Sequence, residues 1–321
     1  MKPLYPLYKT ILLGCIFLLL LSTFSSSCTL QKQKNGKTLR LGFMPNVTHA
    51  TALVGIEKNI FQEELGKNIQ FKPIHFVVGN SIIDAFITGQ IDIAYVGPGP
   101  FINALYRKVP INLLANATNG GSLIVGALHA TLLRDGMRIA VPQYGNTQDL
   151  LLRVYLEKNN LLNKVKILAI PPQDTGTAFF TMSIDAACLP EPWGTILIEK
   201  KVCNLLADEK SLLNNGSYPV TVLVVNKRYA KENPDLVDKF LRAHKKTTLL
   251  LNENPKQSID IVTETISRIS EKQIDKDVIE KSFKRCVFKD KLDLQILKEF
   301  ANIGVKSGYY REGFSYENYI N

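Results

Sequence analysis

Residues 91–106 have the sequence IDIAYVGPGPFINALY, and the order of residue types in this stretch decides the fold class. The segment Ile91–Val96 predicts a strand, Gly97–Pro100 predicts a turn, and Phe101–Tyr106 predicts a helix. Strands and helices alternate in the same way on both sides of this stretch. Because such alternation indicates parallel βαβ units, we predict an α/β protein whose ligand sites lie beyond the carboxyl ends of the strands.

The alternation divides the chain into two groups of elements and a helical tail. The first group has predicted strands at Leu39–Phe43, Gln70–Val78 and Ile111–Ala117 and helices at Ala50–Leu65 and Ser81–Thr88. The second has strands at Arg138–Val141, Val165–Ile170 and Ile184–Leu189 and a helix at Gln148–Asn159. The tail has helices at Pro234–Asn252, Pro255–Ile269, Lys272–Cys286 and Lys291–Ser307.

Two strand-like segments, Leu123–Ala127 and Val220–Val225, cross between the two groups. They predict two α/β lobes joined by a hinge of two segments. We assign residues 39–122 and 220–321 to the first lobe, on which the helical tail packs, and residues 123–219 to the second lobe.

The composition is that of a globular protein with a sizeable core. The 321 residues are 45% hydrophobic and 21% charged, and the formal net charge is +10. The lysines are scattered and form no basic patch with interleaved aromatic residues, so a solvated surface explains the charge better than nucleic-acid binding does. The four histidines have no metal-ligand spacing, and we predict neither a metal nor a cofactor.

The N-terminal residues resemble an export signal. Lys2 and Lys9 precede the apolar run Ile11–Leu21, and small polar residues then lead to Cys28. An apolar run of 11 residues suits a secretory signal peptide better than a membrane span, which needs about 20. We therefore predict a signal peptide over residues 1–28, lipidation of Cys28 and a polar tether over residues 29–38. A soluble secreted form, an uncleaved anchor and processing at Cys15 are the alternatives.

Three cysteines remain in the folded part of the chain, namely Cys188, Cys203 and Cys286. They are far apart and form no CxxC motif, which argues against a redox or zinc site. Buried, unpaired thiols are the favoured interpretation, and one disulfide plus a free thiol is the alternative.

Several predicted strands end in turns rich in Gly, Asn, Ser and Thr. These turns are Pro45–His49, Gly79–Ser81, Gly97–Pro100, Thr118–Ser122 and Gly145–Asp149. Because a helix start offers unpaired backbone N–H groups and positive dipole potential, several converging starts favour a bound anion. Ordinary helix capping explains any single turn, whereas five turns at the strand ends together indicate a binding site.

Five longer motifs follow one another between about residues 39 and 260. They are GFMPNVTHA (42–50), GQIDIAYVGPGP (89–100), VPQYGNTQD (141–149), IDAACLPEPW (184–193) and GSYPVTVLVV (216–225). Together they resemble the nitrate/sulfonate/taurine family of ABC-transporter substrate-binding proteins, and the first-lobe motifs are most similar to members that bind aliphatic sulfonates. The resemblance implies a type II periplasmic-binding-protein fold, a small organic anion in the interlobe cleft, and delivery to a permease and, through it, an ATPase.

The resemblance also implies a set of ligand-binding residues. They are Asn46, His49, Gly79, Asn80, Ser81, Gly97, Pro98, Gly121, Ser122, Asn146, Thr147, Glu191 and Trp193. Trp193, the only tryptophan, is expected to form an apolar wall or to belong to the core. Glu191 is expected to assist lobe closure or orient a donor, and His49 to donate a hydrogen bond or to be structural.

The chain departs from the family pattern at three places. The segment Leu123–Arg138 is a few residues short, Phe179–Ser183 replaces a polar turn that contains glycine, and Cys188 replaces a Trp or branched residue. All three lie in the second lobe near the expected cleft. We therefore expect them to affect the identity of the ligand, among sulfonates, taurine, nitrate, bicarbonate and a pyrimidine precursor, more than the fold.

An enzyme is the competing function, because some enzymes of menaquinone and thiamine synthesis share this fold. It would need a general base or sacrificial residue in the cleft, for which His49 and Asp92 are the candidates. The sequence contains no GxSxG, HExxH or Walker motif, and export argues against a cofactor-pathway enzyme. An adhesin or structural lipoprotein would leave the ordered turns without a role. We thus predict a monomeric, exported binding protein on the outer face of the cytoplasmic membrane.

Overall fold

The computed structural model describes residues 37–291 and 294–311. The predicted signal peptide, Cys28 and nearly all of the predicted tether lie outside the described residues. No helix in the described ranges is both long enough and apolar enough to cross a membrane.

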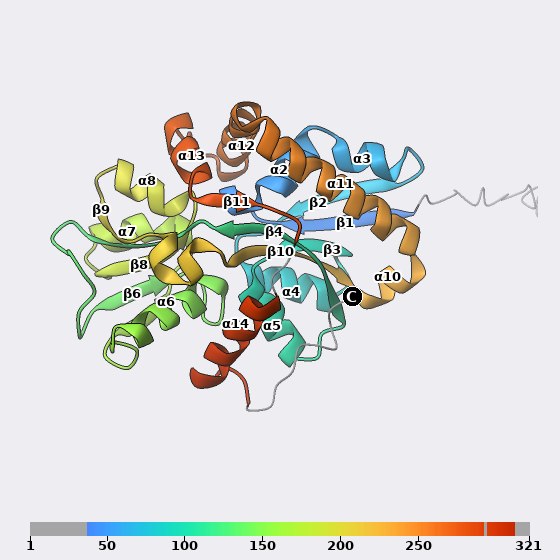
Figure 1. The fold of residues 1–321 in the computed structure, drawn as a ribbon. Helices are drawn as coiled ribbons and strands as arrows, with labels where there is room; N and C mark the ends of the chain where they lie inside the picture. Colours follow the sequence, from blue (N-terminus) through green and yellow to red (C-terminus); the bar gives the residue numbers. More distant parts are fainter. Residues whose placement is uncertain (1–36, 292–293, 312–321) are drawn as a thin grey trace, which may run out of the picture. The chain divides into compact units, whose positions relative to one another are not determined.

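The first lobe is built on a six-stranded mixed sheet (Figure 1). Its strands, in spatial order, are β11 (Cys286–Phe288), β4 (Ile111–Gly120), β10 (Pro219–Asn226), β3 (Ile93–Val96), β1 (Thr38–Phe43) and β2 (Gln70–His75). Strand β1 pairs in parallel with β2 and β3, as the βαβ pattern predicts, whereas β10 runs antiparallel to both β3 and β4. The helices that follow the strands are α2 (Ala50–Glu57), α3 (Ile60–Leu65), α4 (Gly79–Ile87) and α5 (Pro98–Tyr106).

The second lobe is built on a five-stranded mixed sheet. Its strands, in spatial order, are β7 (Lys166–Ala169), β6 (Arg138–Val141), β8 (Ala186–Pro190), β5 (Ser122–Ala127) and β9 (Cys203–Ala207). Here β6 pairs in parallel with β7 and β8, and β5 runs antiparallel to β8 and β9. Its main helices are α6 (Thr147–Lys158), α7 (Thr175–Phe180) and α8 (Trp193–Glu199).

The chain passes from the first sheet to the second at two adjacent glycines. Gly120 and Gly121 link β4 to β5, with φ angles of 72° and 68°. A Cβ atom on Gly120 would lie 2.6 Å from the carbonyl oxygen of Arg285, and one on Gly121 would lie 2.6 Å from Sγ of Cys286. Both the left-handed backbone and the lack of space therefore require glycine at this crossing. The chain returns through residues 208–218 to β10.

The helical tail packs on the first lobe and also reaches the second. Helices α11 (Pro234–Glu253) and α12 (Pro255–Ser270) cover α2, and α11 also covers α3. In contrast, α13 (Lys276–Phe283) contacts α8 of the second lobe, and α14 (Leu294–Lys306) contacts both α5 and α6. The last two helices therefore link the lobes in addition to the two chain crossings.

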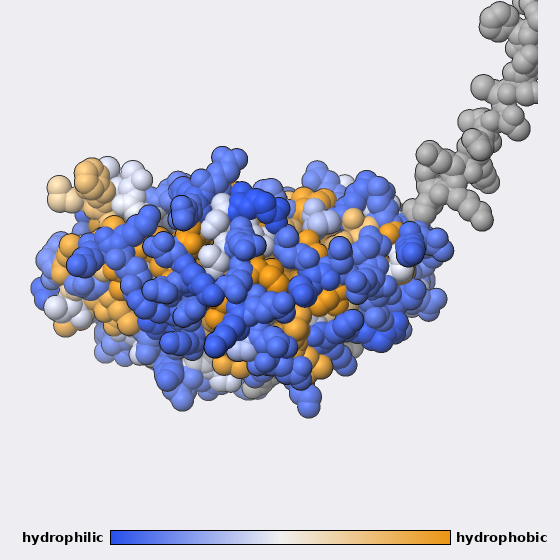
Figure 2. All heavy atoms as spheres, turned by 90° about the horizontal axis from the view of Figure 1, so that it is seen from above, coloured by the Kyte–Doolittle hydropathy of each residue, from blue (hydrophilic) through white to orange (hydrophobic). Residues whose placement is uncertain are grey.

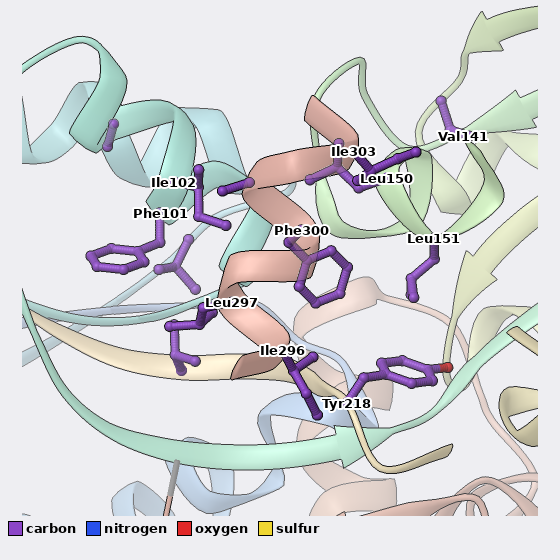
Figure 3. Close-up of a cluster of buried hydrophobic side chains, with 14 of the residues drawn as sticks. Phe101, Ile102, Val141, Leu150, Leu151, Tyr218, Ile296, Leu297, Phe300 and Ile303 are labelled. Atoms are coloured by element: carbon purple, nitrogen blue, oxygen red, sulfur yellow. The ribbon is translucent and has the colours of Figure 1, made fainter. Parts of the chain in front are cut away.

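Helix α14 completes one apolar core that is shared by the two lobes. Its Ile296, Leu297 and Phe300 are at most 1% exposed and belong to the same buried cluster as Phe101 of α5 and Leu151 of α6. Figure 3 shows the Phe300 ring between α5 and α6. Separate buried clusters fill the rest of each lobe.

The predicted fold class is confirmed, and the structure corrects several predicted elements. The helix predicted over 50–65 is interrupted at Asn59, whose φ of 56° ends α2 and allows α3 to start in a new direction. The helix predicted to reach Cys286 ends at Phe283, because Cys286–Phe288 pairs with β4 as a short strand. Helices α7 and α8 and strand β9 were not predicted. The three thiols are buried and unpaired, as predicted.

Candidate functional site

A small cavity of about 30 Å³ lies between the lobes at the carboxyl ends of the strands. Its walls are formed by residues that follow β1, β2, β3, β6 and β7, by Pro190, the last residue of β8, and by Val220 of β10. The polar side chains in its lining are those of Asn46, Thr48, His49, Asn146, Thr147 and Gln148. All six residues are at most 7% exposed, and none carries a formally charged group. This is the position at which open α/β sheets bind ligands.

Three helices begin at the cavity, two in the first lobe and one in the second. They are α4, which starts at Gly79, α5, which starts at Pro98, and α6, which starts at Thr147. Neither α4 nor α5 has a side-chain cap, because their N-cap residues are Val78 and Gly97. The first-turn N–H groups of α4 are therefore available to partners outside the helix, as are the positive ends of both dipoles. In α5 only the N–H of Gly99 is available, because Pro98 and Pro100 have none.

Side chains of the second lobe bind these first-turn groups. The N–H of Gly99 in α5 donates to Oγ1 of Thr147 at 3.2 Å, and the N–H of Asn80 in α4 donates to Oε1 of Gln143 at 3.3 Å. Oxygen atoms of one lobe thus cap helices of the other, and a ligand oxygen could take the same place.

Two further hydrogen bonds join the lobes beside the cavity. Trp193 Nε1 donates to Oδ1 of Asn46 at 2.9 Å, and the N–H of Val47 donates to the carbonyl oxygen of Glu191 at 3.1 Å. Gly97 has to be glycine here, because a Cβ atom at this position would lie 2.3 Å from Oγ1 of Thr147. The lobes are therefore in close contact around a nearly filled cleft.

The imidazole of His49 is a neutral donor in this cavity. It is 1% exposed, and burial lowers its pKa to about 3. Its Nδ1 accepts the N–H of Met44 at 3.3 Å, so the proton of the neutral ring is on Nε2. The site thus offers backbone N–H groups, hydroxyls, amides and one uncharged imidazole, a set suited to an oxyanion.

The two buried histidines give a prediction for the pH dependence of stability. His244 lies between the hydroxyl of Tyr95 (2.8 Å) and the carbonyl oxygen of Asn116 (2.9 Å), and burial lowers its pKa to about 4. Below pH 6.5 the unfolded chain binds protons at both imidazoles, whereas the folded protein does not. The free energy of unfolding should therefore fall on acidification, by up to about 1.4 kcal/mol per pH unit for each imidazole.

Urea unfolding between pH 7.5 and 4.5 measures how the free energy of unfolding depends on pH. In the variant His244→Asn this dependence should be shallower by the equivalent of about one bound proton. An identical slope in the variant would contradict the assignment of a neutral, buried His244.

Seven of the residues expected at the site do not line the cavity. Ser81 is exposed, Gly121 forms the crossing between the sheets, and Pro98 is the first residue of α5. The hydroxyl of Ser122 accepts a hydrogen bond from Nε2 of Gln148 at 3.1 Å, and so it positions a residue that does line the cavity. Asn80 contributes its backbone N–H, as described above. The other two are Glu191 and Trp193.

The carboxylate of Glu191 is fully buried among protein groups. It accepts the hydroxyls of Thr195 at 2.7 Å and of Ser282 at 3.1 Å, and Nε of Arg285 lies 3.3 Å away. Burial raises its pKa, while Thr195, Arg285 and Ser282 act in the opposite direction. Glu191 therefore joins the start of α8 to α13 instead of facing the cavity.

The sequence interpretation missed Thr48, Gln148 and Gln143 as site residues. All three lie inside the quoted motifs, and Thr48 and Gln148 are direct neighbours of the expected His49 and Thr147. A polar side chain within the first turn after a strand was the available signal.

The structure separates the two candidates for a catalytic base. Asp92 lies immediately before β3 and accepts the backbone N–H and the guanidinium of Arg40 at 2.6–2.9 Å, away from the cavity lining. Only His49 lines the cavity. Within the described ranges, no group of three His, Cys, Asp or Glu residues is placed to hold a metal ion.

Comparison with known proteins finds similarity to several binding proteins. The taurine-binding periplasmic protein of Escherichia coli is 26% identical over 196 residues, which are 60% of this chain and 60% of that protein. The alkanesulfonate-binding protein SsuA from Xanthomonas axonopodis pv. citri, solved with MOPS bound, superposes with a TM-score of 0.76 at 19% identity, over 88% of this chain and 98% of the other.

The nitrate-binding protein NrtA of Synechocystis has a TM-score of 0.71 at 14% identity, over 86% of this chain and 83% of its own. The model of the NMT1-like family matches residues 32–267. Since this match spans most of both lobes, the chain belongs to the NMT1-like family.

Proposed function

We propose that this protein is the solute-binding component of an ABC importer, which captures a small organic anion in the interlobe cleft and delivers it to a permease. The observation that carries the proposal is the convergence of three helix starts, from both lobes, at one cavity lined by uncharged donors. An aliphatic sulfonate or a taurine-like compound is the favoured ligand, and nitrate is the alternative. The relatives described above bind ligands of the same classes.

The hydrogen bonds between the lobes suggest how closure and binding are coupled. The N–H of Gly99 binds Oγ1 of Thr147, and that of Asn80 binds Oε1 of Gln143. An anionic oxygen that replaced these acceptors would be bound by the first-lobe N–H groups of Gly99 and Asn80, and the released hydroxyl of Thr147 could donate to it from the second lobe. Binding to both halves favours the closed form. The uncharged lining then gains its attraction for an anion from the helix dipoles.

The organisation of the whole chain is part of this proposal. Residues 39–122 and 220–321 form one lobe and residues 123–219 the other. Residues 1–28 direct export, and a lipid on Cys28 anchors the monomeric protein at the outer face of the cytoplasmic membrane, where it meets the permease and its ATPase. We assign no catalytic step. His49 is buried and neutral and can offer a hydrogen bond, and no other residue in the cavity lining is titratable.

A ligand screen with a matched pair of variants tests the proposal. The protein from residue 29 onwards is titrated with taurine, ethanesulfonate, nitrate and phosphate by calorimetry. At a hundredfold excess over the dissociation constant, a true ligand should also stabilise the fold by about 2.7 kcal/mol. Thr147→Val removes a buried hydroxyl at nearly constant volume and should weaken binding about tenfold or more.

Thr263→Val is the control, because its hydroxyl binds only the carbonyl oxygen of Ile259 within α12, outside the cavity lining. Equal losses of affinity in the two variants would contradict the assigned site. A folded protein that binds none of the anions would contradict the proposed ligand class.

A further inference from the structure

Two larger chambers adjoin the small cavity between the lobes. The junction chamber, of about 280 Å³, is lined by Asn46, Val77 and Pro172, which also line the cavity, and by Trp193. The outer chamber, of about 660 Å³, lies between α7 and α8 of the second lobe and the connection from α12 to α13. It shares Pro172 and Trp193 with the junction chamber. The three spaces therefore lie next to one another, with Pro172 in the walls of all three.

The sizes of these spaces restrict what each can hold. About 30 Å³ is room for one or two water molecules, whereas pockets for organic ligands measure about 300–1,000 Å³. The cavity can accept the oxygens of an anionic head group if these replace the acceptor atoms of Thr147 and Gln143. Any larger part of the ligand has to lie beyond Asn46 and Trp193, in the two chambers.

The lining of the outer chamber suits an apolar group. Phe179, Trp193, Leu197, Ile274 and Val278 contribute to its walls, and the 86% exposed Phe180 lies at its rim. Figure 2, which views the face that carries α12 and α13, shows orange apolar surface exposed between hydrophilic side chains on the side of the second lobe. Contiguous apolar surface of this kind is typical of an interaction or ligand-binding site.

The charges around the outer chamber favour an anion. Lys200, Lys201 and Lys272 contribute to its lining, and none of them has a carboxylate partner among the described residues. Two acidic residues also contribute to this lining. Glu199 is paired with Lys281 at 2.6 Å, so only Asp275 offsets the charge of the three lysines. Positive charge at the mouth would attract an anionic ligand during its approach.

From these observations we infer that the ligand is an elongated, amphipathic organic anion. Its head group binds at the starts of α4, α5 and α6, and its apolar tail runs past Trp193 into the outer chamber. This inference rests on the proposed function. It narrows the substrate class to anions with an aliphatic or aromatic tail, and excludes nitrate as the preferred ligand.

A series of alkanesulfonates from ethane- to octanesulfonate tests the inference. Trp193 is the only tryptophan, so its fluorescence reports directly on the junction between the cavity and the outer chamber. Affinity should rise by up to about fourfold for each methylene that is buried, and octanesulfonate should bind at least about 100-fold more tightly than ethanesulfonate. The emission of Trp193 should shift to shorter wavelength as the tail excludes water.

Thr177→Phe fills the outer chamber from the exposed side of α7, where added bulk does not disturb the core. It should lower the affinity for octanesulfonate at least about tenfold more than that for ethanesulfonate. Thr181→Phe is the matched control, because Thr181 is also exposed, at the end of α7, and does not line the chamber.

The possible outcomes separate the inference from the proposed function. Ethanesulfonate and octanesulfonate binding with equal affinity would overturn the tail chamber and leave the anion site intact. Equal effects of Thr177→Phe and Thr181→Phe on octanesulfonate would do the same. If neither sulfonate binds to the folded protein, the proposed sulfonate function fails together with the inference.

Discussion

Replacing Gly99 by alanine should reduce the affinity for the ligand at least about 100-fold, which corresponds to about 2.7 kcal/mol. The added Cβ atom would lie 2.6 Å from the carbonyl carbon of Asn146 and 2.6 Å from the backbone nitrogen of Thr147. Both contacts are with backbone atoms, so no change of rotamer can relieve them. The starts of α5 and α6 would have to separate, and a ligand could no longer contact both lobes at once.

Calorimetric titration of Gly99→Ala measures this loss, with circular dichroism as the check that the variant is folded. Gly176→Ala is the matched control, since its Cβ atom would approach only Cδ2 of Leu197, the flexible end of a side chain, at 3.2 Å. Taurine is the suitable ligand, because it is short and does not depend on the outer chamber that Gly176 lines. An affinity of Gly99→Ala within about threefold of that of the unchanged protein would contradict the closed geometry described here.

Removing the buried carboxylate of Glu191 should lower the free energy of unfolding by about 3 kcal/mol. In Glu191→Ala the hydroxyls of Thr195 and Ser282 lose their acceptor, and Arg285 keeps only its contact with Glu209 at 3.3 Å. The loss is large because these groups remain away from solvent after the carboxylate is gone. Urea unfolding followed by circular dichroism gives the difference.

Glu199→Ala provides the comparison within the same contact between α8 and α13. Its carboxylate pairs with Lys281 at 2.6 Å, but both side chains are more than one third exposed, so the loss should stay below about 1 kcal/mol. Similar losses in the two variants would show that Glu191 does not anchor this contact through its burial.

Most of the fold could be predicted from the sequence, because buried strands and amphipathic helices have local patterns. Val220–Val225 is rich in β-branched residues, and it forms the centre of β10 in the first sheet. The break at Asn59 has no such pattern, since apolar residues continue at helical spacing on both sides of it. Cys286–Phe288 is too short for a period of two to be recognised, and it is a strand only because β4 lies beside it.

The site could be predicted as far as it depends on strand ends. Asn46, His49, Gly97, Asn146 and Thr147 each follow a strand, and the topology alone brings such residues together at one cavity. The environment of Glu191 could not be predicted in this way. Its partners Ser282 and Arg285 lie in the C-terminal tail, and no local pattern connects them with the motif around residue 191.

The apolar core that α14 shares with α5 and α6 has a consequence for the path by which a ligand enters. Parting the lobes on that side would expose Ile296, Leu297 and Phe300 to water, at roughly 25 cal/mol for each Å² of apolar surface. Helices α14 and α13 lie on opposite sides of the two sheets (Figure 1). A tilt about the α14 edge would keep that core closed and would open the rim near α13 and α8 to solute, at the cost of the buried contacts of Glu191 with Ser282 and Arg285.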